Sequence, residues 1–264
     1  MGLMGLMLVA ACDKIAPEEY TIAAGGSGQQ WAEGAVAYVE KYTGPRCTNC
    51  PEADRTLEAA HHIYGDRLVV VSVNTMSDAF GAPMTGNPDM RTEDGAVWEQ
   101  HWGISSFPTA YVGRSGSQYT GDMRNITGGI EAVLTVAPSF SVSVSAAATG
   151  SSLAIDTEVK TLADYDGAVT LTLVLTEDSL AYWQLDGSTP NPNYVHNHML
   201  RDVVTEPWGK SFAPAVAGAS ATDHTDYTVT NGDIVVENCN IVALVCDAAS
   251  HKVLGCGQCR VSDE

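Results

Sequence analysis

The residues with the clearest chemistry are Cys47 and Cys50, which lie in the segment Cys-Thr-Asn-Cys-Pro. Two cysteines at this spacing can form an intramolecular disulfide and exchange it with another protein through a mixed disulfide. Arg46 precedes the pair, and a helix is expected to begin directly after it, at Pro51. A nearby cation and the positive end of a helix both stabilise a thiolate, which is the nucleophile in this exchange. We therefore expect Cys47 to attack a substrate and Cys50 to resolve the mixed disulfide.

The elements that would position this pair are a strand before it and a helix and a strand after it. Residues 34–39 form an apolar run typical of a buried strand, and residues 51–64 carry apolar side chains at helical spacing. Gly65 is expected to end that helix, and residues 68–73, Leu-Val-Val-Val-Ser-Val, predict a second buried strand. This order places the two cysteines in the turn where the first strand meets the helix.

A downstream segment, residues 103–112, adds a proline directly before an apolar strand. A strand, a C-x-x-C pair that starts a helix and a later Pro-Thr strand resemble the thioredoxin fold. That resemblance implies that the Phe107–Pro108 peptide bond is cis and that Pro108 lies beside the cysteines, where it orients a substrate peptide. It also implies that Glu40 is a buried acid that moves protons to and from Cys50.

Three features depart from the thioredoxin pattern. An arginine precedes the first cysteine where thioredoxins usually carry a tryptophan, Thr-Asn replaces Gly-Pro between the cysteines, and residues 75–100 are inserted before the Pro108 strand. These departures leave the redox potential and the substrate open. A strand over 117–123 and a helix over 125–137 are expected to complete this domain, residues 31–138. The alternative is a thioredoxin-like scaffold in which the two cysteines form a structural disulfide.

The pattern of the sequence changes at residue 139. Segments such as 139–145, 152–159 and 168–176 alternate apolar and polar residues, and short turns rich in Gly, Asn and Asp separate the strands. We therefore expect residues 139–264 to form a second domain, an all-β sandwich of the immunoglobulin-like kind. The predicted fold class is thus an α/β thioredoxin-like domain followed by a β-sandwich domain.

The segment Tyr-Val-His-Asn-His of the second domain contains two candidate metal ligands, His196 and His198. On a strand the two imidazoles would point to one face, where they could bind a metal. The sequence places no third ligand, because Asp202 and His224 are only possible ones, so a structural pair is favoured and no metal or cofactor is expected. Four aromatic side chains nearby would line a binding face or, more often, anchor the core: Tyr182, Trp183, Tyr194 and Trp208.

Four cysteines near the C-terminus are expected to form structural disulfides: Cys239, Cys246, Cys256 and Cys259. If the turn of a C-terminal hairpin is centred on Ala249, Cys239 lies roughly opposite Cys259. No helix is predicted after Cys259, so the electrostatic argument for a second redox pair is absent. A zinc site built from the four thiolates is an alternative, although Cys239 and Cys246 lack the C-x-x-C spacing.

The N-terminal residues 1–12 form an uncharged apolar segment that ends in Val-Ala-Ala-Cys12. This ending resembles a bacterial lipobox, in which the cysteine is acylated and becomes the first mature residue. The segment is too short to span a bilayer, no Lys or Arg precedes Cys12, and the alternative is a buried N-terminal strand or helix. Residues 13–30 include Gly-Gly-Ser-Gly and are expected to be a flexible tether. A lipid on Cys12 would anchor the folded part to a membrane.

Charge and hydropathy exclude two classes of protein. The 264 residues include 32 acidic and 13 basic ones, which gives a net charge of −19 and repels the phosphates of nucleic acids. No apolar run reaches the roughly 18 residues that a membrane-spanning helix needs. We therefore expect neither a nucleic-acid-binding protein nor a multi-span membrane protein.

Several features occur together in this chain: a lipobox, a tether, Thr-Gly-Pro-Arg-Cys-Thr-Asn-Cys-Pro, Phe-Pro-Thr and Tyr-Val-His-Asn-His-Met-Leu-Arg. The combination resembles the outer-membrane-protein-28-related lipoproteins of Gram-negative anaerobes. The resemblance implies a cell-envelope lipoprotein, lipid-anchored in the outer membrane and facing the periplasm or the cell surface, of a kind often described as a surface protein or adhesin. We carry forward two hypotheses. One is thiol–disulfide exchange on exported proteins; the other is binding of an extracellular partner, with the thioredoxin-like domain as a scaffold.

Overall fold

The structure, a computed structural model, describes residues 30–212 and 216–263. Cys12, the signal over 1–12 and residues 13–29 of the expected tether lie outside the described residues, so the structure does not test those predictions. In the part of the chain that is described, no helix is both long enough and apolar enough to cross a membrane.

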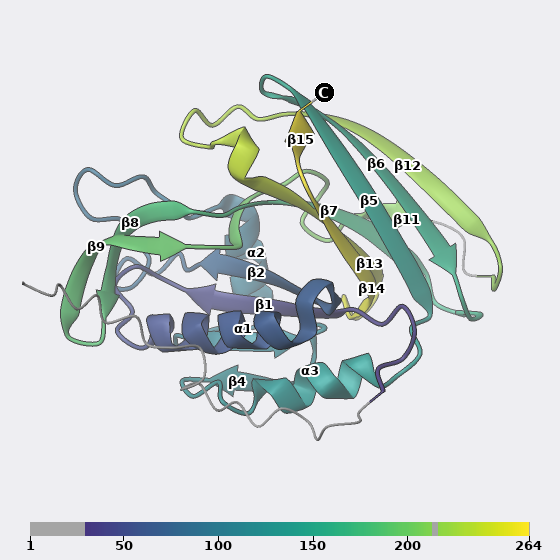
Figure 1. Cartoon of the computed structure of the whole chain (residues 1–264), viewed down its shortest axis with the longest axis horizontal. Helices are drawn as coiled ribbons and strands as arrows, with labels where there is room; N and C mark the ends of the chain where they lie inside the picture. The colour runs from purple at the N-terminus through teal and green to yellow at the C-terminus, as the bar shows by residue number, and fades with distance from the viewer. Residues whose placement is uncertain (1–29, 213–215, 264) are drawn as a thin grey trace, which may run out of the picture.

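The central feature of the fold is a nine-stranded sheet that takes strands from both halves of the chain (Figure 1). Its order is β14-β13-β7-β10-β2-β1-β3-β4, and β11 pairs with β7 off this path. One end comprises β1 (Ala37–Thr43), β2 (Leu68–Asn74), β3 (Thr109–Val112) and β4 (Ser115–Thr120). The other end comprises β7 (Val169–Glu177), β10 (Met199–Val203), β11 (Lys210–Phe212), β13 (Cys239–Asp247) and β14 (Val253–Arg260). The two ends meet where β10 runs parallel to β2, with Met199 opposite Ser72.

Helices cover both faces of the β1–β2 end of the sheet. On one face, α1 (Cys50–Tyr64) and α3 (Ile126–Leu134) pack on the sheet through a shared apolar cluster. On the other face, α2 (Glu93–His101) contributes the fully buried Trp98. The helix predicted over 51–64 is confirmed as α1, and the strand predicted over 68–73 is confirmed as β2.

Side chains of β1 alternate between these two faces, as the pleat of a strand requires. Val39 packs with α1 and α3, whereas Tyr38 packs in the cluster that contains Trp98. Glu40 therefore lies on the Trp98 side of the sheet, and its neighbour Lys41 faces α1. The acidic and the basic residue of β1, Glu40 and Lys41, thus lie on opposite faces of the sheet.

A second sheet, of order β12-β6-β5-β15, faces the β7–β13–β14 end of the large sheet across an apolar core. It comprises β5 (Phe140–Thr149), β6 (Ser152–Thr161), β12 (Ser220–Thr228) and β15 (Ser262–Asp263). Gly255 and Gly257 of β14 allow β5 to approach closely, since a Cβ there would lie 2.7 Å and 2.5 Å from the carbonyl oxygens of Phe140 and Val142. The strands predicted within 139–176 are confirmed, and the second half is β-rich. Its assignment to an immunoglobulin-like sandwich stays a prediction.

The remaining strands, β8 (Leu180–Asp186) and β9 (Thr189–His196), form a separate two-stranded sheet. This β8–β9 hairpin, residues 180–196, follows β7 in the chain and reaches the end of α1 at which the helix begins (Figure 1). It brings a segment of the second half of the chain to the C-x-x-C turn of the first half.

Candidate functional site

A disulfide joins Cys47 to Cys50, with an Sγ–Sγ distance of 2.10 Å. The pair follows β1, and Cys50 is the first residue of α1, with Pro51 in the first turn. The first four N–H groups of a helix have no partner within it, so a charge on the Cys50 sulfur would lie at the positive end of α1. The predicted position of the pair, between a strand and the start of a helix, is confirmed.

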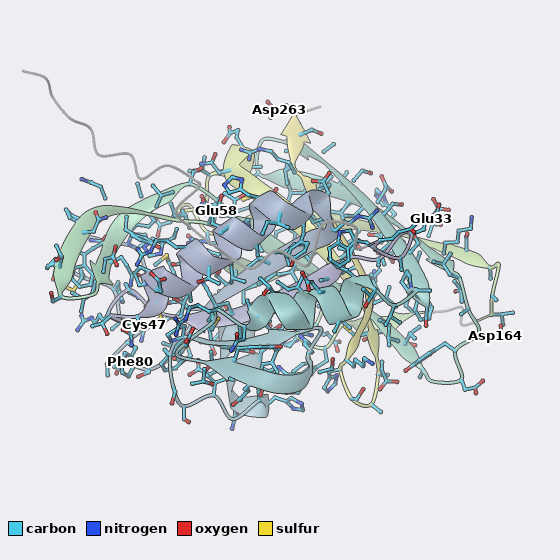
Figure 2. The ribbon with its side chains drawn as sticks, turned by 60° about the horizontal axis from the view of Figure 1, so that its bottom comes forward. Glu33, Cys47, Glu58, Phe80, Asp164 and Asp263 are labelled. Carbon is cyan, nitrogen blue, oxygen red and sulfur yellow. A yellow bond between two sulfur atoms is a disulfide. The ribbon has the colours of Figure 1, made fainter. Side chains whose placement is uncertain are left out.

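The Phe107–Pro108 peptide bond is cis, as expected, and it immediately precedes β3. The next residue, Thr109, is paired with Tyr42 near the end of β1 that leads to the disulfide. Phe80, from the inserted segment, lies between the two features. Its carbonyl oxygen accepts a hydrogen bond from the backbone N–H of Arg46 at 2.9 Å, and its ring lies 5.4 Å from the ring of Phe107. Figure 2 labels Phe80 beside Cys47.

The β8–β9 hairpin covers the disulfide turn. The side-chain amide of Gln184 donates to the carbonyl oxygens of Cys47 at 3.0 Å and Gly44 at 3.3 Å. Backbone N–H groups of Leu185 and Gly187 donate to the carbonyl oxygens of Pro45 and Thr48 at 2.8 Å and 2.9 Å. In this fold Cys47 is 2% exposed and Cys50 is 0% exposed. The attacking sulfur expected from the sequence is therefore buried.

Two further contacts hold the same hairpin along α1. The Arg55 guanidinium forms an ion pair with Asp186, with 3.1 Å between Nη1 and Oδ2. The hydroxyl of Tyr194 donates to Oδ2 of Asp54 at 2.8 Å. Sequence reasoning identified Tyr194 only as one of several aromatic side chains, and it missed Gln184, Asp54 and Arg55, because the partners lie far apart in the chain.

Glu40 belongs to a separate buried cluster. Its carboxylate is 0% exposed and accepts hydrogen bonds from the hydroxyls of Tyr38 at 2.8 Å and Tyr42 at 2.6 Å. Oε2 also accepts from Nε of Arg114 at 2.8 Å. Burial and the nearby Glu40 charge raise the pKa of each tyrosine hydroxyl well above the usual tyrosine value. Because this cluster lies on the face opposite α1, the proton-carrying role of Glu40 stays a prediction of the resemblance alone.

Lys41 is the ionisable residue of β1 that faces α1. Its side chain is 4% exposed, and its ammonium contacts the carboxylate of Asp54, one helical turn after Cys50. Burial lowers the pKa of Lys41 to about 7, and the adjacent carboxylate opposes that change. Sequence reasoning did not select this residue, although a lysine inside a buried strand was a usable signal.

The two candidate metal ligands do not share the face of one strand, so that expectation is wrong. The strand β9 ends at His196, and His198 lies in the following turn with a φ of 59°. His196 is buried, which lowers its pKa to about 4, and its Nε2 has no hydrogen-bond partner. Nδ1 of His198 lies 3.4 Å from the carboxylate of Asp178. Within residues 30–212 and 216–263, no three His, Cys, Asp or Glu side chains are grouped to hold a metal ion.

The four C-terminal cysteines are free thiols in the structure, contrary to the expected structural disulfides. The register of β13 and β14 explains the difference, because no cysteine faces another across the hairpin: Cys246 pairs with Val253, Cys256 with Leu244 and Cys259 with Ile241. The Cys246–Val253 pair centres the turn between Ala249 and Ser250, and a register shift between Val245 and Cys246 moves the remaining pairs by one more residue, so Cys259 lies opposite Ile241 and not Cys239. Burial raises the pKa of Cys246 to about 11 and of Cys239 to about 12.

The remaining aromatic candidates act mainly as packing groups. The ring of Trp208 stacks on His251 at 3.9 Å, and Tyr182 packs against a small apolar cluster. The backbone N–H of Trp183 donates to the side chain of Asn87 at 2.9 Å. Of the four, Tyr194 is the one that contacts α1, through Asp54.

A family profile described as outer membrane protein Omp28 matches residues 96–264. Two solved structures resemble most of the fold. HBP35 of Porphyromonas gingivalis is 18% identical, matches 89% of this chain and 77% of its own chain, and has a TM-score of 0.69. Protein AGR_C_4864 from Agrobacterium tumefaciens is 18% identical, matches 87% of this chain and 96% of its own chain, and has a TM-score of 0.52. At these identities the likeness concerns the fold alone. A domain of the outer membrane lipoprotein Omp28 from Porphyromonas gingivalis matches 48% of the chain and 91% of its own length, with 20% identity and a TM-score of 0.36. No curated protein matches the chain.

Proposed function

The chain belongs to the family of outer membrane protein Omp28, and from this premise we propose a cell-envelope lipoprotein that exchanges disulfides with exported proteins. Residues 31–138 would form its thioredoxin-like domain, and an acylated Cys12 would anchor it in the outer membrane. The single observation that carries the redox proposal is the disulfide between Cys47 and Cys50 at the N-terminal end of α1. The contacts of Phe80 support it, because they join the disulfide turn at Arg46 to the segment of Phe107 that precedes β3.

The proposed reaction oxidises a substrate dithiol. A substrate thiolate attacks Sγ of Cys47, the Cys47–Cys50 bond breaks, and Cys50 leaves as a thiolate. The second substrate thiolate then attacks the substrate sulfur of the mixed disulfide and releases Cys47. The substrate gains a disulfide, the protein gains two thiols, and the two protons pass from the substrate to the protein. The helix end stabilises the thiolate of Cys50 as it leaves.

The β8–β9 hairpin sets a condition on this reaction. A substrate thiolate cannot reach Sγ of Cys47 while this residue is 2% exposed. The hairpin is hydrogen-bonded to the turn that holds Cys47, and it is the element that we propose moves before attack. Movement breaks the hydrogen bonds that Gln184, Leu185 and Gly187 make to the turn. The proposed exchange is therefore gated by the hairpin, and the fraction of open molecules limits its rate.

The same cover favours a second candidate function. A disulfide buried under a hairpin can be a structural link, and the protein would then be a surface lipoprotein that binds an extracellular partner through its β-rich half. The two functions differ in whether the native protein reacts with a dithiol. Under the second function, the disulfide reacts only when the fold is lost.

The test is a single-turnover assay of the oxidised protein with a peptide that contains two cysteines. We expect one substrate disulfide to form for each protein molecule in native buffer, and no product from Cys47→Ser. Product that forms only in denaturant would refute the exchange function and support the structural one. Incorporation of labelled palmitate, lost in Cys12→Ala, tests the lipid anchor separately.

A further inference from the structure

A cavity of about 670 Å³ lies beside α1, on the face of the sheet to which Lys41 points. Its lining comes from β1 and β2, from α1, and from the end of β9 with the turn that follows it. Figure 2 labels one lining residue, Glu58, farther along α1 than Cys47. A volume of this size is typical of small-molecule sites in proteins. The exchange reaction proposed above does not use the cavity.

The lining includes large apolar side chains from three elements. Leu57 and Ile63 belong to α1, Val70 to β2 and Val195 to β9. Two of them keep much of their surface in water, since Ile63 is 43% exposed and Val195 is 52% exposed. An apolar ligand in the cavity would cover this surface, and removing it from water is favourable.

The polar groups of the cavity gather where β1 and β2 are paired. Lys41 and Ser72 are direct neighbours in the β1–β2 register, and both line the cavity. An ammonium has three N–H donors, and Asp54 is the hydrogen-bond partner that the described residues give to Lys41. Lys41 therefore has N–H donors left for an acceptor oxygen of a ligand in the cavity.

The charges around the cavity compensate one another. The lining contains the basic residues Lys41 and Arg55 and the acidic residues Asp54 and Glu58. Lys41 is paired with Asp54, and Arg55 is paired with Asp186 outside the lining. A charged ligand would compete with these pairs and lose its own hydration. A neutral acceptor can add to Lys41 and leave the pair with Asp54 intact.

We propose that this cavity binds a neutral, mainly apolar small molecule whose carbonyl oxygen accepts a hydrogen bond from Lys41. The apolar part of the ligand lies against Leu57, Ile63, Val70 and Val195. Tyr194 and His198, from the Tyr-Val-His-Asn-His segment, complete the wall on the side of β9. This assigns a role to a segment whose histidines do not form a metal site.

The test uses the full chain and prodan, a neutral naphthalene dye with one carbonyl group. Prodan emission moves to shorter wavelength in apolar surroundings, so titration reports both affinity and environment. We expect saturable binding of one dye for each chain with a blue shift. Decanamide and decanoate, which share one tail, serve as competitors, and neutral decanamide should displace prodan at a lower concentration than anionic decanoate.

Two variants separate this site from others. Ala59 lines the cavity from α1 and is only half-buried, so Ala59→Trp should fill the cavity without disturbing the core and abolish binding. Leu162→Trp, at an exposed position outside the cavity, is the matched control and should bind as the wild type does. Lys41→Met should weaken binding by about tenfold, since a hydrogen bond from a charged donor is lost.

Three results would overturn the proposal. They are no blue-shifted binding of prodan to the wild type, unchanged binding to Ala59→Trp, and displacement by decanoate at lower concentration than by decanamide. The first two results would show that the cavity is not the binding site, and the third would show that the site does not prefer a neutral ligand. If Lys41→Met does not fold, the comparison of Ala59→Trp with Leu162→Trp still decides the site, and the comparison of decanamide with decanoate still decides the class of ligand.

Discussion

The side-chain amide of Gln184 donates to the carbonyl oxygen of Cys47 at 3.0 Å, across 137 residues of sequence. The contact joins the β8–β9 hairpin to the disulfide turn, in which Cys47 is buried. Under the proposed gating, reaction of the disulfide in the native protein depends on this segment from the other half of the chain.

Replacement of Gln184 by alanine should make the disulfide easier to reduce. The substitution removes the hydrogen bonds to Cys47 and Gly44, and each such bond contributes on the order of 1 kcal/mol. We expect reduction by dithiothreitol in native buffer to be roughly 30-fold faster, because more molecules have an open hairpin. Gln100→Ala, at an exposed position on α2, is the control. Equal rates for Gln184→Ala and the wild type would show that the hairpin does not limit access.

Removal of the Glu40 carboxylate should mainly reduce stability. Glu40→Leu leaves the buried Arg114 guanidinium without its ion-pair partner, which typically costs about 3–5 kcal/mol. Arg114→Met in the same chain should restore part of that loss, because no buried charge then remains unpaired. Urea denaturation of the two single variants and the double variant measures this coupling. If the loss of unfolding free energy in the double variant equals the sum of the losses in the two single variants, the ion pair between Glu40 and Arg114 is contradicted.

The stability of the protein should fall in acid through His196. Burial lowers the pKa of this imidazole from 6.5 to about 4, so the folded state binds its proton less readily than the unfolded state. The stabilisation that the neutral folded form provides is present above pH 6.5 and is lost as the pH falls toward 4. Between pH 7 and pH 5 the loss from this group is about 2 kcal/mol.

The measurement for His196 is the difference in unfolding free energy between pH 7 and pH 5. His196→Gln cannot titrate in this range, so the wild type should lose about 2 kcal/mol more than the variant does. His62→Gln, at an exposed position on α1, should behave as the wild type does. If the unfolding free energy of His196→Gln depends on pH as that of the wild type does, His196 is not the group responsible.

The C-terminal cysteines should titrate as thiols. With the disulfide intact, a thiol reagent should detect four groups per chain in denaturant, from Cys239, Cys246, Cys256 and Cys259, when the protein begins at residue 30. In native buffer the reaction should be slow, because burial raises the pKa of Cys246 to about 11 and of Cys239 to about 12. If the reagent detects two thiols or none in denaturant, the cysteines do form the structural disulfides that the sequence suggested.

Local patterns predicted the elements around the disulfide. The run over 68–73, the helical spacing over 51–64 and the period-two segments after residue 139 were sufficient for β2, α1 and β5–β7. The cis bond at Pro108 followed from a resemblance rather than from spacing. In each case the signal lies within a few residues of the feature it predicts.

Long-range arrangements left no such signal. The hairpin binds the C-x-x-C turn largely through backbone carbonyl oxygens, which every residue possesses, so no side-chain pattern records the contact. Likewise β10 joins β2 at a single registered pair, Met199 and Ser72. The expected pairing of Cys239 with Cys259 failed for a different reason, because the turn lies half a residue beyond Ala249 and a register shift at Cys246 displaces the strands further.

The most direct test of the central claim is to trap a mixed disulfide on the native protein. Cys50→Ser leaves Cys47 without its resolving partner, so a peptide disulfide should form a stable adduct with Cys47. Mass spectrometry should find one peptide on Cys47 in native buffer and more adduct when Gln184→Ala is added, with none on Cys47→Ser. No adduct in native buffer, together with full labelling in denaturant, would contradict the account and leave a purely structural disulfide.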